Sequence, residues 1–273
     1  MKTFTLVLLC FLATTFSFSE VSKIEKDALL ALYKSTNGEK WNHTWNLSEP
    51  IENWYGITVE NSQVVEINLH FNNLKGTLPQ EIGNLVNLRK LNLGFNQLEG
   101  QLPSTLGNLK ALVSLELFMN KFMGTIPSEI CNLTNLKVLK LYSNGITGEI
   151  PTSIGNLVNL KELLLGSNYL TGTIPAEIKN IQQLEILSLI DNNLVGEIPF
   201  EIGSLTQLKE LVLASNKLTG TVPYQVTGLS QLSTFMVSDN DFDREYVSLV
   251  GGNGIHPNKF IEFNSKTVIT DND

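Results

Sequence analysis

The sequence predicts an α/β solenoid, a fold in which one supersecondary unit repeats along the chain and stacks on its neighbours. Two observations predict it: proline recurs at a constant interval of 24 residues, and asparagine recurs at the same interval, seven residues before each proline. A fixed period of this length is the sequence signature of a solenoid. The prolines are Pro79, Pro103, Pro127, Pro151, Pro175, Pro199 and Pro223, and the asparagines are Asn72, Asn96, Asn120, Asn144, Asn168, Asn192, Asn216 and Asn240.

Each repeat begins with a short predicted strand. Alternation such as Leu91-Asn92-Leu93 indicates period-two burial, with both leucines inward and the middle residue outward. Stacked repeats would pair these strands side by side into a parallel sheet, about 4.8 Å apart. The recurring asparagine follows the strand, and its amide can satisfy main-chain groups of its own turn and of the neighbouring turn.

The rest of each repeat is predicted to turn back toward the next strand. A glycine such as Gly76 relieves the backbone at a sharp bend, and the apolar residue before each proline stays extended. Segments such as IGNLVNL then predict a short helical or 3₁₀ turn, with Ile82, Leu85 and Leu88 facing inward. No single repeat can bury its own leucines, so only stacking completes the core.

The consensus LxGxIPxxIGNLxxLxxLxLxxN resembles the plant-specific class of leucine-rich repeat, which occurs in receptor ectodomains, polygalacturonase inhibitors and secreted bacterial relatives. The resemblance covers residues 64–240, read as eight coils. It implies a right-handed superhelix with a concave parallel β-sheet, closed by a cap at each end. It indicates the fold far better than the ligand.

Residues 20–63 look like the N-terminal cap of this family. Ile24, Ala28, Leu29, Leu32 and Tyr33 mark one face of a predicted helix that stops near Asn37-Gly38. The aromatic residues expected to cover the open end of the core are Trp41, Trp45, Trp54 and Tyr55. The paired cysteines of plant caps are missing, which favours the cysteine-free bacterial relatives. Residues 241–273 are predicted to form the C-terminal cap.

Residues 1–19 have the pattern of a secretory signal peptide. Lys2 precedes an apolar run from Phe4 to Phe16, and small residues lead to a predicted cut after Ser19. The alternative is an N-terminal membrane anchor, which the short apolar core disfavours. We therefore expect a secreted or cell-surface protein, or a periplasmic one in a diderm bacterium. Cys10 would leave with the signal, so Cys131 would remain as a single thiol without a disulfide partner.

Composition and motifs argue against several classes of function. A net charge of −8 disfavours nucleic acid and anionic membranes as partners. The three histidines, His43, His70 and His256, are far apart in the sequence, and Cys131 occupies a slot that is glycine in other repeats. Metal-ligand spacings and phosphate-binding loops are also missing. The sequence therefore predicts no enzyme, no metal and no cofactor.

The outward positions of the sheet are the ones that the scaffold leaves free, and they are the predicted ligand-binding residues. An apolar group around Phe118, Met119, Tyr142, Leu164 and Ile190 is typical of a binding surface, although strand propensity alone also favours such residues. Phe71 and Phe95 occupy the next column and are expected to tuck partly inward. The predicted binding residues are His70, Glu116, Phe118, Lys140, Tyr142, Leu164, Ile190 and Met236.

A threonine recurs in every second coil between the glycine and the proline, at Thr77, Thr125, Thr173 and Thr221. Regular threonine ladders on flat faces can organise water, which suggests ice binding. The intervening Glu and Gln residues argue against a uniform ladder, and threonine is favoured in any exposed extended segment.

The sequence therefore predicts a secreted binding protein whose concave sheet recognises a protein, peptide or glycan. A rigid curved sheet would bind without an ordering cost. The alternative is an extracellular protein for adhesion or stress protection, including ice binding through the threonine flank.

Overall fold

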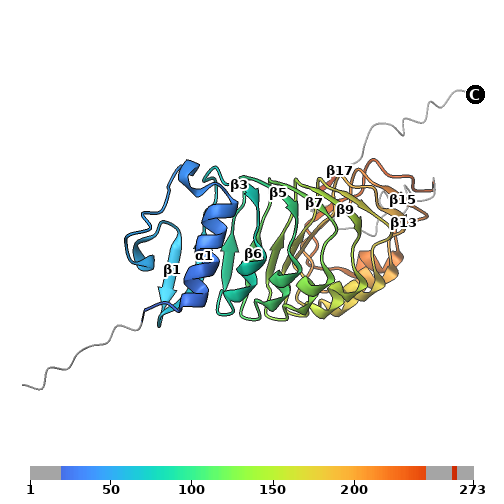
Figure 1. Cartoon of the computed structure of the whole chain (residues 1–273). Helices are drawn as coiled ribbons and strands as arrows, with labels where there is room; N and C mark the ends of the chain where they lie inside the picture. Colours follow the sequence, from blue (N-terminus) through green and yellow to red (C-terminus); the bar gives the residue numbers. More distant parts are fainter. Residues whose placement is uncertain (1–19, 244–259, 263–273) are drawn as a thin grey trace, which may run out of the picture.

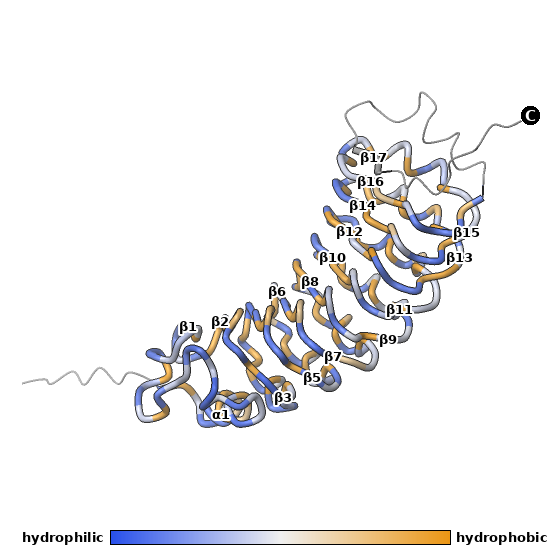
Figure 2. The backbone as a smooth tube through the Cα atoms, turned by 90° about the horizontal axis from the view of Figure 1, so that it is seen from above, coloured by the Kyte–Doolittle hydropathy of each residue, from blue (hydrophilic) through white to orange (hydrophobic). Residues whose placement is uncertain are grey.

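The computed structural model describes residues 20–243 and 260–262, which form a curved stack of coils (Figures 1 and 2). The predicted signal peptide, residue His256 and most of the predicted C-terminal cap lie outside the described residues. Seen from above in Figure 2, one row of strands follows the inner side of the arc, and helix α1 (Lys23–Ser35) lies on the outer side with a second row of strands. The predicted α/β solenoid with a concave parallel sheet is confirmed.

The inner strands form a ten-stranded sheet in the order β1-β2-β4-β6-β8-β10-β12-β14-β16-β17. Strand β1 pairs antiparallel with β2, and the strands from β2 to β17 pair in parallel. From β2 to β16 the residues that face one another are 24 apart, as Leu163 and Leu187 are. The strands are β1 Ile57–Glu60, β2 Gln63–Asn68, β4 Lys90–Asn92, β6 Ser114–Glu116, β8 Val138–Lys140, β10 Glu162–Leu164, β12 Ile186–Ser188, β14 Glu210–Val212, β16 Thr234–Met236 and β17 Phe260–Glu262.

A second row of short strands runs along the outer side of the arc. It comprises a five-stranded sheet, β11-β9-β7-β5-β3, and the pair β13-β15. These strands are β3 Lys75–Thr77, β5 Gln97–Gln101, β7 Lys121–Gly124, β9 Gly145–Glu149, β11 Tyr169–Thr171, β13 Val195–Glu197 and β15 Lys217–Thr219. Their facing residues are 22 apart instead of 24, as Tyr169 and Thr147 are. We attribute the offset to the longer outer arc, which strands bridge by tilting across the stack.

Short 3₁₀ helices complete the coils and confirm the predicted turns. Each follows a repeat proline, which has an extended backbone, and each buries one large apolar side chain such as Ile82. They are η3 Gln80–Asn84, η4 Ser104–Asn108, η5 Ser128–Asn132, η6 Thr152–Asn156, η7 Ala176–Asn180, η8 Phe200–Ser204 and η9 Tyr224–Gly228. Two more, η1 Gly38–Lys40 and η2 Ile51–Asn53, lie near the N-terminal end.

Helix α1 covers the first coil, and its sequence explains where it starts. The Ser22 hydroxyl caps the helix by accepting a hydrogen bond from the Glu25 amide. Glu25 is buried, and its carboxylate accepts a hydrogen bond from the Val64 amide, which ties the helix to β2. The prediction that Ile24 faces inward is wrong, because its side chain is 63% exposed. This position, two residues after the N-cap Ser22, points away from the core that Ala28, Leu29 and Leu32 contact.

The tryptophans of the first coil pack as predicted, whereas the neighbouring tyrosine does not. Trp41, Trp45 and Trp54 are buried, and the rings of Trp45 and Trp54 stack with centroids 4.7 Å apart. Tyr55 is 46% exposed and stacks instead on the imidazole of His43, 4.3 Å away. Its predicted role in covering the core is therefore wrong. The limits of the cap, residues 20–63, stay a prediction.

The recurring asparagines form the predicted ladder of side-chain hydrogen bonds. The Asn168 amide donates to the carbonyls of Leu141, Leu165 and Gly166, at 3.0 to 3.2 Å, and its oxygen accepts from the Ile146 amide at 3.0 Å. Leu141 and Ile146 belong to the preceding coil, so one side chain joins two coils. Buried main-chain groups need such partners because water cannot reach them.

A short row of charges lies just before the inner strands. Glu185 accepts hydrogen bonds from the ammonium groups of Lys161 and Lys209, at 2.7 and 2.6 Å, across three successive coils. These two hydrogen bonds lower the pKa of the Glu185 carboxyl to about 2. A carboxyl whose pKa is lower in the folded state stabilises the fold above its unfolded pKa, and this contribution disappears as the pH falls through the folded pKa.

We therefore expect the chain to be more stable than a Glu185→Gln variant at neutral pH, and the difference to vanish between about pH 4.5 and 2. Because these side chains are partly exposed, the effect should be small and should weaken at high salt. Urea unfolding midpoints across this pH range measure it. The matched control is Glu177→Gln, a change at an exposed carboxyl in η7. A difference that persists at pH 2 would contradict the assignment.

Candidate ligand-binding surface

The eight predicted binding residues all face away from the core on the concave side. Glu116, Lys140, Leu164 and Met236 end strands β6, β8, β10 and β16, and each is partly exposed. The other four follow a strand by two residues; of these His70 is exposed, whereas Phe118, Tyr142 and Ile190 are partly exposed. The structure brings His70, Phe118 and Tyr142 together. Leu164, Ile190 and Met236 lie on later coils, and Leu164 faces Lys140 on the neighbouring strand.

The group is part of a cluster of five aromatic rings, which we call the aromatic cluster: His70, Phe71, Phe95, Phe118 and Tyr142. The His70 ring lies 5.7 Å from that of Phe118, 6.1 Å from Phe95 and 6.4 Å from Phe71. Phe71 and Phe95 meet edge to face at 5.1 Å, and Phe118 stacks on Tyr142 at 4.8 Å. The cluster therefore covers the inner face of the first four coils without a break.

A glycine makes the contact between His70 and Phe118 possible. These residues are two coils apart, a separation of about 9.6 Å between strands, yet their ring centroids are only 5.7 Å apart. Gly94 lies between them, and a Cβ atom there would be 2.5 Å from the Phe118 ring. The Phe118 ring thus lies across the bare backbone of Gly94 to reach His70. Gly94 is 24 residues from both His70 and Phe118, so it holds the equivalent position of the coil between them.

A Gly94→Val substitution is expected to push the Phe118 ring aside and to break its contact with His70 while the fold persists. The added side chain meets a surface ring, and Gly94 is outside the set of left-handed glycines, so the backbone accepts valine. Loss of ring-current shifts on the His70 imidazole resonances in NMR spectra would report the displacement. The control is Gly166→Val, which meets Ile190 in the same way outside the cluster and should leave His70 unchanged.

Phe71 and Phe95 correct an expectation from the sequence, because neither tucks inward. Their side chains are 61% and 46% exposed, and both backbones are left-handed, with φ of 52° and 57°. Met119, the equivalent residue of the next coil, is 42% exposed with φ of 49°. A left-handed backbone turns the side chain away from the core, and large residues adopt it at an energetic cost. Local sequence carries no clear signal of this conformation.

Ion pairs flank the aromatic cluster. Lys140 binds Glu162 on the next strand at 3.0 Å, and Lys90 binds Glu66 at 3.1 Å. Partial burial lowers the pKa of the Lys140 ammonium, but the hydrogen bond from Lys140 to Glu162 and the nearby charges more than offset it and raise that pKa. Partial burial also raises the pKa of Tyr142. At neutral pH the face therefore presents a protonated lysine and a neutral phenol beside the rings.

The threonine flank lies at the ends of the outer strands. Thr77 ends β3, whereas Thr125, Thr173 and Thr221 follow β7, β11 and β15 by one or two residues, and all four are exposed. They are 48 residues apart and therefore occupy alternate coils. The intervening coils have Gln101, Glu149 and Glu197 at this position. This alternation argues against a uniform threonine ladder on the flank.

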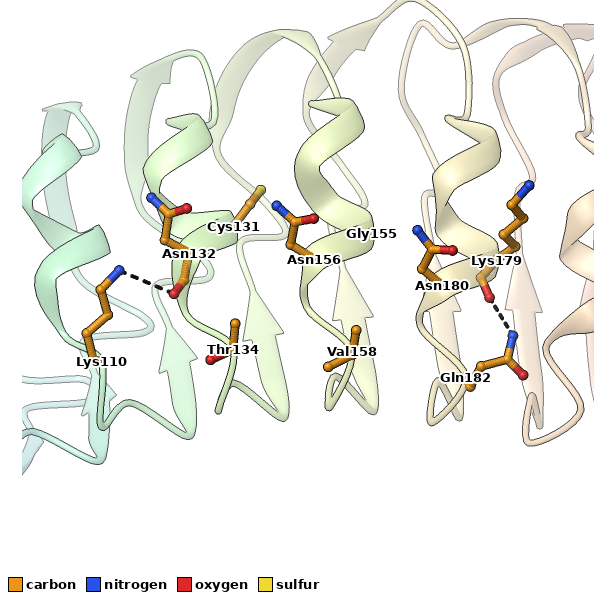
Figure 3. A pocket seen from close by; sticks show the side chains of 10 residues that line it. All are labelled: Lys110, Cys131, Asn132, Thr134, Gly155, Asn156, Val158, Lys179, Asn180 and Gln182. Carbon is orange, nitrogen blue, oxygen red and sulfur yellow. Dashed lines mark hydrogen bonds between the residues drawn. The ribbon is translucent and has the colours of Figure 1, made fainter.

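A shallow hollow of about 860 Å³ lies on the helical side of the coils, beside η5, η6 and η7 (Figure 3). Two of its polar side chains bond to backbone: Lys110 donates to the Asn132 carbonyl and Gln182 to the Lys179 carbonyl. Cys131 is buried at its edge, and burial raises the pKa of the thiol. This side offers neither convergent polar groups nor a reactive thiolate.

Among residues 20–243 and 260–262, no group of three or more His, Cys, Asp or Glu side chains could hold a metal ion. Within the same residues, no helix has the length and apolar character needed to cross a membrane.

The sequence matches two models of one repeat family. The model described as a leucine-rich repeat region matches residues 67–163, and the model described as a leucine-rich repeat matches residues 159–181 and 183–205. Together with the stacked coils, these matches show that the chain belongs to the leucine-rich repeat proteins. Among curated proteins, none is similar enough in sequence to count as a match.

Several solved structures share this fold. The PEPR1–AtPEP1 structure is 37% identical with a TM-score of 0.74, and the match covers 79% of this chain and 31% of that one. The ectodomain of the Arabidopsis receptor kinase HAESA, in complex with an extended IDA peptide hormone ligand, is 29% identical with a TM-score of 0.72, covering 88% and 40%. A leucine-rich repeat protein of Leptospira interrogans is 35% identical with a TM-score of 0.61, covering 70% and 48%. The chain thus spans less than half the length of these proteins.

A plant ice-binding protein has a similar length and the same fold. It is 23% identical with a TM-score of 0.59, and the match covers 82% of this chain and 88% of that one. At this identity the likeness concerns the fold alone.

Proposed function

We propose that the chain is a secreted, non-enzymatic leucine-rich repeat protein that binds a protein, peptide or glycan on its concave sheet, with the aromatic cluster at the centre of the site. The observation that carries the proposal is the unbroken group of five partly exposed rings on the inner face. Exposed apolar patches of this kind mark binding surfaces, and aromatic residues dominate binding energies. The peptide hormone in the HAESA structure supports a ligand of that class.

The scaffold also favours binding over catalysis. The Asn ladder and the packed core hold the inner strands rigidly, so the rings are positioned before a ligand arrives. His70 lies among aromatic rings, and Cys131 is buried with a raised pKa, so neither is an activated nucleophile.

The test is capture of ligands from the extracellular medium of the source cells by the immobilised chain. A Phe118→Glu, Tyr142→Glu variant places charge in the aromatic cluster. The matched control is Phe200→Glu, Tyr224→Glu, which alters two exposed rings in η8 and η9 on the helical side. Circular dichroism should show all three proteins folded. A ligand kept by the chain and the control but lost by the cluster variant supports the proposal. Equal capture by all three overturns it.

Secretion through residues 1–19 is part of the same proposal. The pattern of a positive residue, an apolar run and small residues before Ser19 supports it. Mass spectrometry of the protein recovered outside the source cells should find an N-terminus at Glu20. Recovery only inside the cells with residues 1–19 retained would overturn it. The assignment to the plant-type 24-residue class with cysteine-free bacterial relatives rests on the consensus and on Val59, where plant caps have a cysteine.

Adhesion or stress protection, including ice binding, stays the alternative. The flank threonines occupy alternate coils, with Gln or Glu between them, so they do not form the regular ladder that ice binding would favour. A cold-stage assay of ice growth should therefore show crystals of ordinary shape. Faceted crystals that disappear with a Thr125→Lys, Thr173→Lys variant would favour the alternative.

A further inference from the structure

Eight residues, each three positions after the end of an inner strand, form a row that we call the rim row. The polarity and charge of their side chains change along the row. Each adopts a left-handed backbone, with φ between 49° and 57°. The row is apolar over the first three coils, neutral and polar over the next two, and mainly acidic over the last three. In order its members are Phe71, Phe95, Met119, Ser143, Ser167, Asp191, Ser215 and Asp239.

The scaffold does not require large side chains at the start of the rim row. Three later coils have serine at this position and two have aspartate, all with the same backbone. Aspartate is more readily left-handed than a large side chain, and serine is at least small. Strained conformations that persist at bulky residues mark functional positions. The large side chains of Phe71, Phe95 and Met119 are therefore better explained by contact with a ligand than by a requirement of the fold.

The arrangement of the rings favours a polypeptide side chain over a sugar ring as the ligand. A sugar ring stacks flat on a free aromatic face. Phe118 and Tyr142 cover one another's faces, with 11° between their planes, and Phe71 and Phe95 meet at 65°. Rings at such angles leave short apolar crevices between edges and faces, which suit a compact aromatic or aliphatic side chain.

The other half of the inner face has the opposite character. From the start of the inner strands onward, the inner-face positions of the last four coils include Glu162, Asp191, Glu210 and Asp239 and no lysine or arginine. Lys161 and Lys209 lie just before the strands, where both pair with Glu185. Glu162 is neutralised by Lys140. None of the ion pairs in the described part of the chain involves Asp191 or Glu210. This half of the face is thus complementary to positive charge.

From these observations, and resting on the proposed concave-face function, we infer that the ligand is an extended polypeptide segment lying along the rim row. It places a large apolar side chain in the aromatic cluster and lysine or arginine toward Asp191 and Asp239. Phe95 and Asp191 are four coils apart, about 19 Å at about 4.8 Å per strand, which an extended chain spans with about six residues. Asp239 lies two coils further, about three residues more.

The test is selection of a random library of peptides about fifteen residues long on the immobilised chain, with a glycan array probed in parallel. Selected peptides should share an apolar residue and a lysine or arginine six to nine positions apart. Variants are built from the chain's own repeats: Phe71→Ser, Phe95→Ser, Met119→Ser installs the serine of later coils, and Asp191→Ser, Asp239→Ser does so at the acidic end. Both variants should fold, because serine already occupies equivalent positions.

The outcomes separate this inference from the proposed function. For a selected peptide, fluorescence anisotropy should show at least a tenfold loss of affinity with the triple-serine variant. The loss with the acidic-end variant should be smaller and should disappear at high salt. Glycans bound in place of peptides, or peptides selected without that spacing, overturn the inference but leave concave binding intact. Peptides or glycans that bind the triple-serine variant and the Phe118→Glu, Tyr142→Glu variant as tightly as the parent overturn both.

Discussion

Replacing Asn168 with alanine is expected to lower the free energy of unfolding by about 3 to 5 kcal/mol. The side chain is 6% exposed and serves three carbonyl groups and one amide, from Leu141, Leu165, Gly166 and Ile146. Alanine removes four hydrogen bonds at once. The buried Ile146 amide loses its acceptor, whereas the carbonyls of Leu141, Leu165 and Gly166 each keep one other donor. The unpaired amide costs about 1 to 3 kcal/mol and each other lost hydrogen bond about 0.5 to 1.5 kcal/mol, and relaxation of the backbone recovers part of the sum.

Urea unfolding monitored by circular dichroism measures this effect. Asn135→Ala is the matched control, because Asn135 is exposed and donates a single hydrogen bond to the Lys110 carbonyl. The control should change stability by less than about 1 kcal/mol. An Asn168→Asp variant tests the mechanism, since aspartate keeps the acceptor for Ile146 and loses the donors. If Asn168→Ala were as mild as the control, the ladder would not be what joins the coils.

Replacing Phe122 with alanine should cost about 3 to 5 kcal/mol. Phe122 is fully buried on β7, at a position where other coils have leucine or isoleucine. Removing the ring leaves a cavity that neighbouring coils cannot close, because their own strands are held in register by the Asn ladder.

The adjacent residue provides the control for this change. Met123 is on the same strand but points outward, with its side chain 54% exposed, so Met123→Ala should shift the urea midpoint only slightly. A Phe122→Leu variant should fall between the two, since leucine is the residue of most other coils. A loss for Phe122→Ala no larger than for Met123→Ala would mean that the core relaxes around the cavity.

Much of the fold could be predicted because each repeat has the same spacing of apolar residues, asparagine and proline. The inward leucines and the 3₁₀ turns depend on local spacing, and both are found as expected. The failures are local exceptions: Ile24 points to solvent and Tyr55 stacks on His43. Both lie before the first regular coil, where periodicity no longer constrains the side chains.

The candidate surface was predictable only in part. Placing His70, Phe118 and Tyr142 outward required nothing beyond strand alternation. Their assembly with Phe71 and Phe95 could not be predicted, because it depends on left-handed backbones after the strands and on the missing side chain of Gly94. Likewise, the sequence did not show that the outer strands pair residues 22 apart instead of 24.

The sequence by itself determined the unit, its period, which residues face the core and which asparagines join the coils, because these follow from hydrophobic spacing and hydrogen-bonding capacity within one repeat. Only the tertiary structure decided which outward side chains meet. Inner strands pair residues 24 apart and outer strands pair residues 22 apart. We attribute this difference to the curvature of the whole stack, in which the outer arc is longer than the inner one (Figure 2), because curvature is a property of many coils together.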